Sequence, residues 1–366
     1  MRKIILMAAA CLMAFVSCQE KNSYTIKGTV EGVADGDTIY LQDWVDNHFV
    51  KVDSTVVKGG SFEFTGVPDS TTLVRYVTYM NDNVQMLALT FMERGTINVE
   101  LKQQKSKISG TLCNDAYQKF TERYDSVAKV MQDLYRKTMT DSVLTEQQHK
   151  DLEMEIDKKG EEALDMIYHS IEENIGNAMG LQTLLTFGAS FTPDRILPLI
   201  DKVPAIYANN DELVAMKEHF QVLENTWEGK KFVDFTMSTP GGKEVKLSDY
   251  VSKNKYTLVD FWASWCGPCR AEMPLVVKMY NQYKAKGLGI VGVSLDNNLD
   301  SWKKGIQALG ITWPQMSDLK GWQCEGAKLY GVRSIPHTIL ISQDGTIVKR
   351  DLQGYKLLIE VEKLLN

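Results

Sequence analysis

Residues 258–274 read Leu-Val-Asp-Phe-Trp-Ala-Ser-Trp-Cys-Gly-Pro-Cys-Arg-Ala-Glu-Met-Pro. The apolar run 256–263 predicts a buried strand, and the residues that follow Cys269 predict a helix. Cys266 and Cys269 therefore lie where a strand gives way to a helix. A second short motif, Ser334-Ile335-Pro336, stands directly before another apolar run.

Strands and helices alternate around this stretch, from residue 229 to the C-terminus. Further strands are predicted at 288–295, 337–341 and 346–350, the last two forming a hairpin around Gln343-Asp344-Gly345. Helices are predicted at 269–286, 299–309, 325–330 and 356–365. This alternation predicts an α/β sandwich with one mixed sheet.

The cysteine motif and the later proline resemble those of thioredoxin, and the TlpA/ResA-like envelope oxidoreductases, with an AhpC/TSA-redoxin type of domain, are the most similar subgroup. The resemblance covers residues 229–366. It implies a thioredoxin fold and a thiol:disulfide oxidoreductase that needs no cofactor beyond a redox-active Cys266–Cys269 disulfide. Its partners would be protein disulfides and an upstream envelope thiol reductant.

The start of a helix favours a thiolate at Cys266, because free N–H groups and the helix dipole stabilise an anion there. A thiol of pKa ~8.5 is only a few per cent ionised at neutral pH, whereas a pKa of ~7 makes about half of it nucleophilic. Cys266 is predicted to attack, and Cys269, one turn on, to resolve the mixed disulfide. The alternatives for the pair are a static disulfide or half of a zinc site. Zinc would need two more ligands, and Cys324 and His337 are the only candidates in the sequence, so no metal is expected.

Two carboxylates accompany the pair. Asp260 interrupts the apolar strand, and a buried carboxylate is costly unless it is protonated or hydrogen-bonded, which suggests a function. The resemblance assigns to Asp260 the handling of the proton of Cys269. Glu272, at i+3 from Cys269, assists the same transfer in the TlpA/ResA-like subgroup, although a solvated helix residue is the competing interpretation.

Substrate contacts are expected at the same end of the domain. Ile335 and Pro336 resemble the family's cis-proline loop, which pairs with an extended substrate strand. Trp265 offers an apolar surface, and Gly267 and Pro268 lie between the cysteines. His337 could either tune the thiolate or point into the sheet, and Trp262 is expected in the core.

The N-terminus carries an export signal. Arg2 and Lys3 precede an apolar run of about 13 residues, too short to span a membrane, which needs roughly 20. The run ends in Phe15-Val16-Ser17-Cys18, which resembles a bacterial lipobox and implies cleavage after residue 17 and acylation of Cys18. A plain signal peptide is the alternative. The expected location is the cell envelope, facing the periplasm and anchored by lipid.

The segment between signal and oxidoreductase domain has two parts. Residues 18–110 show short period-two segments separated by turn residues, which predicts an all-β sandwich or barrel resembling an uncharacterised module of envelope lipoproteins. Residues 111–228 change to a helical period and predict a helical region, in which His149, His169 and His219 have no partner at metal-ligand spacing. Cys113 and Cys324 are expected to be spare thiols or a disulfide pair.

The composition of the 366-residue chain is that of a soluble globular protein. Its 41 Lys and Arg against 47 Asp and Glu are interspersed, which disfavours nucleic-acid binding. The sequence predicts a lipid-anchored envelope enzyme that reduces protein disulfides, with cytochrome c maturation or envelope redox homeostasis as its setting. One alternative is a peroxiredoxin-like peroxidase, although Ser264-Trp265 before Cys266 does not match the residues that normally precede the cysteine of such enzymes. The other alternative is a lipoprotein that only binds partners.

Overall fold

The computed structural model describes residues 22–68, 73–81, 84–140 and 144–366. The predicted signal peptide and Cys18 lie outside these ranges. The chain forms two compact units, which divide between Thr121 and Glu122. Among the described residues, no helix is both long enough and apolar enough to cross a membrane.

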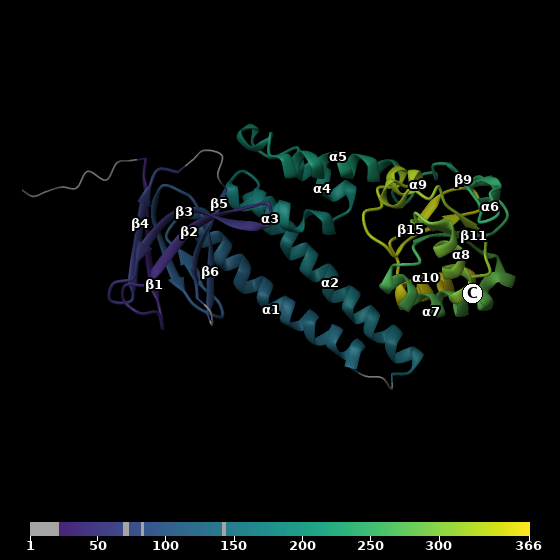
Figure 1. Ribbon diagram of the computed structural model, residues 1–366, viewed down its shortest axis with the longest axis horizontal. Coiled ribbons are helices and arrows are strands. Elements are labelled where there is room, and N and C mark those ends of the chain that lie inside the picture. The colour runs from purple at the N-terminus through teal and green to yellow at the C-terminus, as the bar shows by residue number, and fades with distance from the viewer. Residues whose placement is uncertain (1–21, 69–72, 82–83, 141–143) are drawn as a thin grey trace, which may run out of the picture. The chain divides into compact units, whose positions relative to one another are not determined.

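The first unit is a β module with two four-stranded sheets. One sheet has the order β4-β1-β7-β8 and the other β3-β2-β5-β6 (Figure 1). The strands are β1 Tyr24–Val30, β2 Thr38–Val45, β3 His48–Val56, β4 Ser61–Gly66, β5 Val74–Met80, β6 Gln85–Phe91, β7 Gly95–Leu101 and β8 Lys107–Ser109. Alternate apolar side chains of β1, β4 and β7 are buried in one core, as period-two patterning requires. The predicted all-β N-terminal fold is confirmed.

The helices that follow begin in this unit and continue into the second. They are α1 Leu112–Thr140, α2 Glu146–Asn174, α3 Ala178–Phe187, α4 Pro193–Ile200 and α5 Asp211–Asn225, with short 3-10 turns at η1 Gly188–Ser190 and η2 Ala205–Tyr207. Thr145 begins α2 with a capping box, because its side chain accepts from Gln148 N and the Gln148 side chain accepts from Thr145 N. The predicted central helical region is confirmed.

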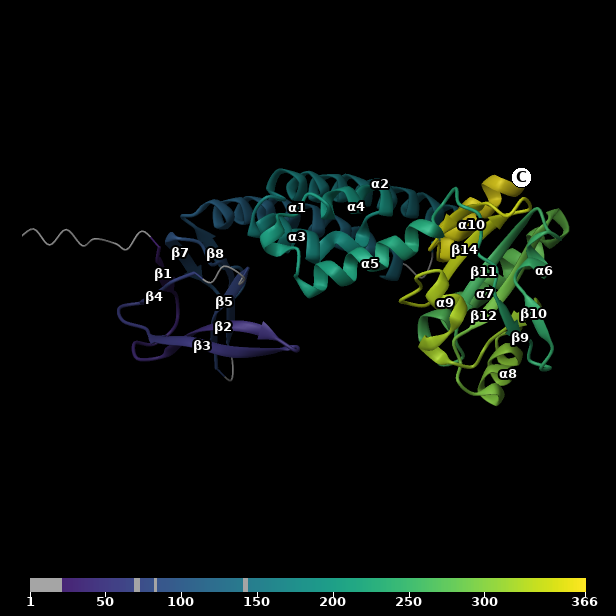
Figure 2. The same ribbon diagram turned by 90° about the horizontal axis from the view of Figure 1, so that it is seen from above.

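The C-terminal part of the second unit is an α/β sandwich. Its five-stranded sheet has the order β13-β12-β11-β14-β15, with β11 parallel to β12 and antiparallel to β14 (Figure 2). The strands are β11 Tyr256–Trp262, β12 Leu288–Ser294, β13 Gln315–Met316, β14 His337–Ser342 and β15 Ile347–Arg350. The predicted mixed sheet is thereby confirmed. A small hairpin of β9 Thr236–Ser238 and β10 Glu244–Lys246, which the sequence analysis did not predict, precedes it.

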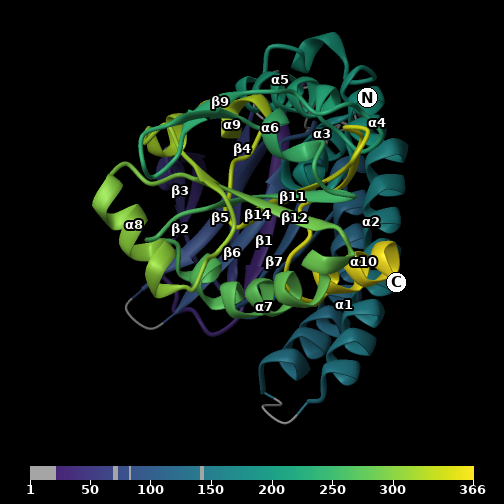
Figure 3. The same ribbon diagram turned by 90° about the vertical axis from the view of Figure 1, so that its right-hand side faces the viewer.

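Helices cover this sheet on both faces. Figure 3 shows α7 and α10 side by side on one face, with α6 across the sheet from them. The helices are α6 Ser248–Val251, α7 Gly267–Tyr283, α8 Leu299–Ala308, α9 Glu325–Leu329 and α10 Gly354–Leu365, with 3-10 turns η3 Lys284–Lys286 and η4 Gly321–Gln323. The helix α7 runs through Pro274 without interruption. It carries both cysteines at its N-terminal end.

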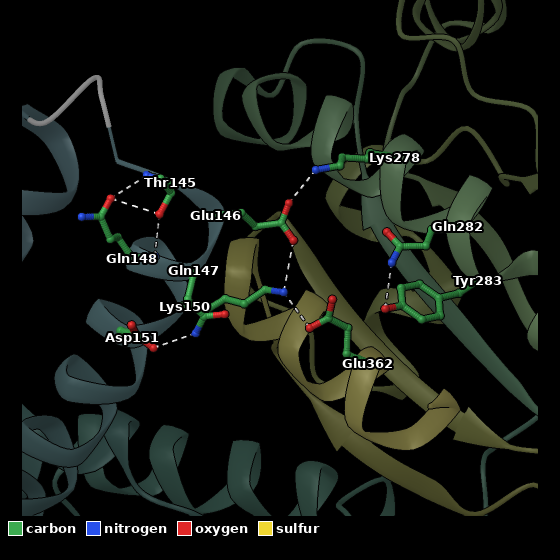
Figure 4. Close-up of polar contacts among 10 residues, drawn as sticks. All are labelled: Thr145, Glu146, Gln147, Gln148, Lys150, Asp151, Lys278, Gln282, Tyr283 and Glu362. Atoms are coloured by element: carbon green, nitrogen blue, oxygen red, sulfur yellow. Dashed lines mark hydrogen bonds and ion pairs between the residues drawn. The ribbon is translucent and has the colours of Figure 1, made fainter.

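The long helix α2 packs against the α/β sandwich within the second unit. The Glu146 carboxylate accepts from Lys278 Nζ at 2.6 Å, and Lys150 Nζ lies 3.1 Å from Glu146 and 2.7 Å from Glu362 (Figure 4). His149, the residue before Lys150, stacks on Tyr355, with ring centroids 4.7 Å apart. These contacts hold α2 beside α7 and α10.

Candidate active site

The cysteine pair occupies the first turn of α7. Cys266 is the N-cap residue, with an extended backbone, and its Sγ accepts a hydrogen bond from Cys269 N at 3.1 Å. Cys266 and Cys269 form a disulfide, and their Cα atoms lie 5.4 Å apart. Both residues are buried, at 4% and 2% exposure. The hydrogen bond and the helix dipole would favour negative charge on Cys266 once the disulfide is reduced.

The Ile335–Pro336 loop lies directly beside Cys266. The peptide bond between these residues is cis, and the Ile335 carbonyl oxygen is 3.7 Å from Cys266 Sγ. In the reduced protein this oxygen can accept a hydrogen bond from the Cys266 thiol. The structure therefore brings together two motifs that are 69 residues apart in the sequence.

Asp260 lies in the middle of β11 with a carboxylate removed from water. The residue is 4% exposed, and its Oδ2 has no hydrogen-bond partner among the described residues. Burial, together with the nearby charge of Glu272, raises the pKa of Asp260 to about 7. A carboxyl group with this pKa can both take up and release a proton near neutral pH.

Glu272 is a partly buried residue rather than a solvated one. Its carboxylate accepts a hydrogen bond from Gly354 N at the start of α10. Burial raises its pKa, the Gly354 hydrogen bond opposes the rise, and the charge of Asp351 adds to it. Asp260 and Glu272 are therefore electrostatically coupled, on neighbouring elements β11 and α7.

A hydrogen-bonded chain that the sequence analysis missed holds the proline loop. Gln353 Nε2 donates to the Pro336 carbonyl at 2.8 Å and to Asp351 Oδ1 at 3.3 Å. His337 Nδ1 lies 3.1 Å from the same Asp351 oxygen, and His337 Nε2 lies 3.3 Å from Arg350 Nη2. Because the guanidinium can only donate, His337 Nε2 is the acceptor and Nδ1 carries the proton. His337 is thus bound to Asp351 and Arg350.

A second missed residue, Asp296, holds the turn that leads into the cysteines. Its carboxylate accepts from Ser264 N at 3.0 Å, from Ser264 Oγ at 2.5 Å and from Ser294 Oγ at 2.7 Å. The residue follows β12 and is 1% exposed. A buried carboxylate with several donors fixes the position of the backbone just before Cys266.

Aromatic side chains next to the cysteines divide between surface and core. Trp265 is 54% exposed and its ring centroid lies 6.3 Å from that of Trp322, which is also exposed. Trp262 is fully buried and donates from Nε1 to Gln315 at 2.9 Å. Trp322, which no motif pointed to, thus extends the apolar surface predicted at Trp265.

The other two cysteines within the described ranges, Cys113 and Cys324, are both buried. Cys324 is a buried thiol, and burial raises its pKa to about 11. Cys113 is buried in the first turn of α1. No group of three or more His, Cys, Asp or Glu side chains that could hold a metal ion occurs within the described ranges.

Two sequence profiles match the chain. The profile of the AhpC/TSA family matches residues 229–350, and a domain of unknown function, DUF4369, matches residues 24–117. A relative from Bacillus thuringiensis (strain Al Hakam), named thiol-disulfide oxidoreductase ResA, is 33% identical over 149 residues, which cover 38% of this chain and 80% of the relative. This chain belongs to the ResA-like thiol-disulfide oxidoreductases.

Other similar proteins carry related names. The ResA protein of Oceanobacillus iheyensis is 38% identical over 122 residues, 33% of this chain and 60% of the relative. The thioredoxin domain of a thiol-disulfide oxidoreductase from Bacteroides vulgatus is 37% identical, with a TM-score of 0.36, and the match covers 38% of this chain and 99% of that one. The predicted enzyme class, thiol-disulfide oxidoreductase, is confirmed by this ResA-like membership.

Proposed function

We propose that this ResA-like protein is an exported, lipid-anchored envelope enzyme that reduces protein disulfides through Cys266 and Cys269. The observation that carries the proposal is the cysteine pair at the N-terminus of α7, beside the carbonyl of Ile335. The thiol-disulfide oxidoreductase names of the relatives support the same chemistry.

The reaction transfers two electrons from the dithiol to the substrate. The Cys266 thiolate attacks one sulfur of the substrate disulfide, a mixed disulfide forms, and the other substrate sulfur leaves as a thiolate. Cys269 then loses its proton and attacks Cys266 Sγ, which releases the second substrate thiolate. The enzyme is left with the Cys266–Cys269 disulfide, and an upstream envelope thiol reductant returns it to the dithiol.

Asp260 accepts the proton of Cys269 in this proposal. Its raised pKa of about 7 matches the task, because a base is most effective when its pKa lies near the working pH. Glu272 tunes Asp260 through its charge. The exposed Trp265, with Gly267, Pro268, Ile335 and Pro336, contacts the substrate segment.

The proposed location and the candidate substrates are supported by patterns in the sequence. Export and acylation at Cys18 are proposed from the short apolar run that ends at this residue. The Gly-Pro pair between the cysteines resembles that of reducing thioredoxins, which favours the reductive direction. The cysteines of apocytochrome c and other envelope disulfides are the candidate substrates.

The proposal is tested by the reduction of insulin under a limiting amount of dithiothreitol. The whole mature protein should accelerate the precipitation of the insulin B chain, and Cys266→Ser should abolish the acceleration. Consumption of hydrogen peroxide at a rate above that of insulin reduction would instead favour the peroxidase alternative. If the protein shows neither activity although its disulfide can be reduced, that result would favour a protein that only binds partners.

A further inference from the structure

A groove of about 800 Å³ lies between the thioredoxin-like domain and the central helices, and Pro268, which stands between the two cysteines in the sequence, lines it. One wall is formed by Pro268, Ala271, Glu272 and Leu275 of α7 and by Pro336. The opposite wall is formed by Tyr135 of α1 and Glu153 of α2. The groove thus connects the substrate-contacting prolines with a part of the chain that lies outside the thioredoxin-like domain.

The position of the helical wall is fixed by several contacts. The stacking of His149 on Tyr355 and the ion pair between Asp157 and Lys356 lie on either side of Glu153 along α2. Tyr355 and Lys356 themselves line the groove. His149 and Asp157 lie one turn before and one turn after Glu153 on the same face of α2, and both contact α10. The position of this wall relative to α10 is therefore fixed.

The groove is acidic. Glu153, Glu272 and Asp351 line it, and the ammonium group of its one lysine, Lys356, is paired with Asp157. Glu272 is hydrogen-bonded to Gly354, and Asp351 to His337 and Gln353. Glu153, half-buried, makes no hydrogen bond or ion pair within the described part of the chain.

The Glu153 carboxylate feels the charge of nearby Lys356 but is not directly paired with it. Burial raises the pKa of Glu153, and the charge of Lys356, whose ammonium group is paired with Asp157, opposes this rise without cancelling it. A basic side chain that enters the groove would give this half-buried carboxylate a direct hydrogen-bond donor, which it does not have within the described part of the chain. The apolar side chains of Pro268, Leu275 and Pro336 would contact the aliphatic part of a long lysine or arginine.

We propose that this groove binds an extended segment of the protein substrate, which carries a lysine or arginine within a few residues of the reacting cysteine, and that Glu153 selects for this basic residue. The inference rests on the proposed function, because the substrate's disulfide must lie at Cys266. A strand that pairs with the Ile335–Pro336 backbone and continues past Pro268 enters this groove. The central helices therefore take part in substrate choice.

The test uses two synthetic peptides with the same internal disulfide, one flanked on both sides by lysine and the other by glutamate. For the whole mature protein, kcat/KM for the lysine peptide should exceed that for the glutamate peptide by a factor of about five or more. An ion pair of about 1 kcal/mol corresponds to this factor. The ratio of the two peptides is the readout, because a general loss of folding or of activity cancels in it. Glu153→Gln should bring the ratio close to unity and Glu153→Lys should invert it, whereas Glu155→Lys, an exposed position on the same helix, should keep the wild-type direction.

Equal rates for both peptides in the wild-type protein would overturn the inference, as would the same change of ratio in Glu155→Lys and Glu153→Lys. A parallel measurement uses the peptides with serine in place of cysteine, and their binding is followed by fluorescence anisotropy. If the lysine peptide binds more tightly in a Glu153-dependent way but neither disulfide is reduced, the groove assignment stands and the proposed redox function fails. If both disulfides are reduced without selectivity, the proposed function stands and the groove assignment fails.

Discussion

At the scale of the residue, the buried carboxyl group of Asp260 destabilises the folded domain when it is ionised. Its folded-state pKa of about 7 lies above the ordinary value of 3.8, because burial disfavours the charged form. A difference of that size corresponds to a destabilisation on the order of 4 kcal/mol when the group is ionised. Such a cost in the middle of β11 is consistent with the proposed role of Asp260 as the base for Cys269.

The raised pKa predicts the pH dependence of stability. Between pH 3.8 and about 7 the folded protein holds a proton on Asp260 that the unfolded chain has lost, so the free energy of unfolding falls as pH rises through this window. Asp260→Asn should remove this fall. Unfolding by urea at pH 5 and pH 8, followed by tryptophan fluorescence, is expected to show a pH-dependent loss that is smaller by about 2 kcal/mol or more in the variant.

The control for this measurement is Glu155→Gln, since Glu155 is exposed on α2. It should retain the pH dependence of the wild-type protein. The same dependence in Asp260→Asn as in the wild-type protein would mean that Asp260 does not titrate near neutral pH.

The two active-site thiols should differ in reactivity. Cys266 receives the hydrogen bond from Cys269 N and caps the helix, so its thiolate is stabilised, whereas Cys269 lies inside the first turn at 2% exposure. Alkylation of the reduced protein at mildly acidic pH should label Cys266 first. Cys324, whose pKa burial raises to about 11, serves as the internal unreactive control. Faster labelling of Cys269 would reverse the proposed roles of attacking and resolving thiol.

The sequence indicated some of these residues and not others, for a physical reason. Cys266, Cys269 and Asp260 stand at characteristic local spacings, so one short stretch is sufficient to single them out. Asp296 and Gln353 act through hydrogen bonds to residues 32 and 17 positions away. Their contacts depend on how β12 and the segment after β15 are placed, and no local pattern carries that information.

At the scale of the element, α8 packs closely against the turn that carries the cysteines. A Cβ atom at Gly305 would lie 2.8 Å from Ser264 Cβ and 3.3 Å from the ring of Trp262. Contacts this short cannot be accommodated without a shift of the backbone of α8 or of the turn at Ser264. Gly305 thus permits the close approach of a helix to the active-site turn.

Two glycine substitutions in helices should have opposite effects. Gly160→Ala in α2 should stabilise the protein by about 0.5–1 kcal/mol, because alanine favours the helix and its Cβ would meet nothing closer than Met131 Cε at 4.0 Å. Gly305→Ala gains the same helix propensity but should destabilise the protein by about 1–3 kcal/mol through overpacking. Urea unfolding of both variants measures the difference. A stabilising effect of Gly305→Ala would show that the approach of α8 is not tight.

The strong periodic elements of the chain were predictable, and the short or irregular ones were not. The apolar runs of β11 and β12 and the helical periods of α2 and α7 identify these elements from the sequence. The strand β3 begins at His48, because Asp46 and Asn47 adopt positive φ values of 49° and 62° and turn the chain into a hairpin. The three-residue strands β9 and β10 are too short to show a period.

At the scale of the whole molecule, side-chain contacts join the central helices of the second unit to its thioredoxin-like domain. Arg350 Nη1 donates to the Thr226 carbonyl at 2.6 Å, just after α5, while its Nη2 donates to Tyr330 O. Contacts of α2 with Lys278, Tyr355 and Glu362 add a second line of attachment. The sequence predicted the helical region and the thioredoxin-like domain but not the contacts between them. The side chains of α2 that make these contacts lie on a charged helix face, which the sequence pattern predicts to be exposed to solvent.

Anchoring of the whole molecule is predicted to depend on Cys18. The apolar run that precedes it is about 13 residues long, and a single acyl chain would hold a protein only marginally, so several chains on this residue are expected. Expression of Cys18→Ser should shift the protein from the membrane fraction to the soluble envelope fraction. The control is Cys113→Ser, which should remain in the membrane fraction. Retention of Cys18→Ser in the membrane would assign the anchoring to another segment.

The central claim, that Cys266 attacks protein disulfides and Cys269 resolves them, is tested most directly by trapping. The full-length Cys269→Ser variant, produced in cells and isolated after acid quenching, should carry partner proteins in mixed disulfides on Cys266, which are released by dithiothreitol. The matched variant Cys266→Ser, with Cys269 intact, should carry few or none. Equal trapping by both variants, or no dithiothreitol-sensitive adduct with Cys269→Ser, would contradict the account.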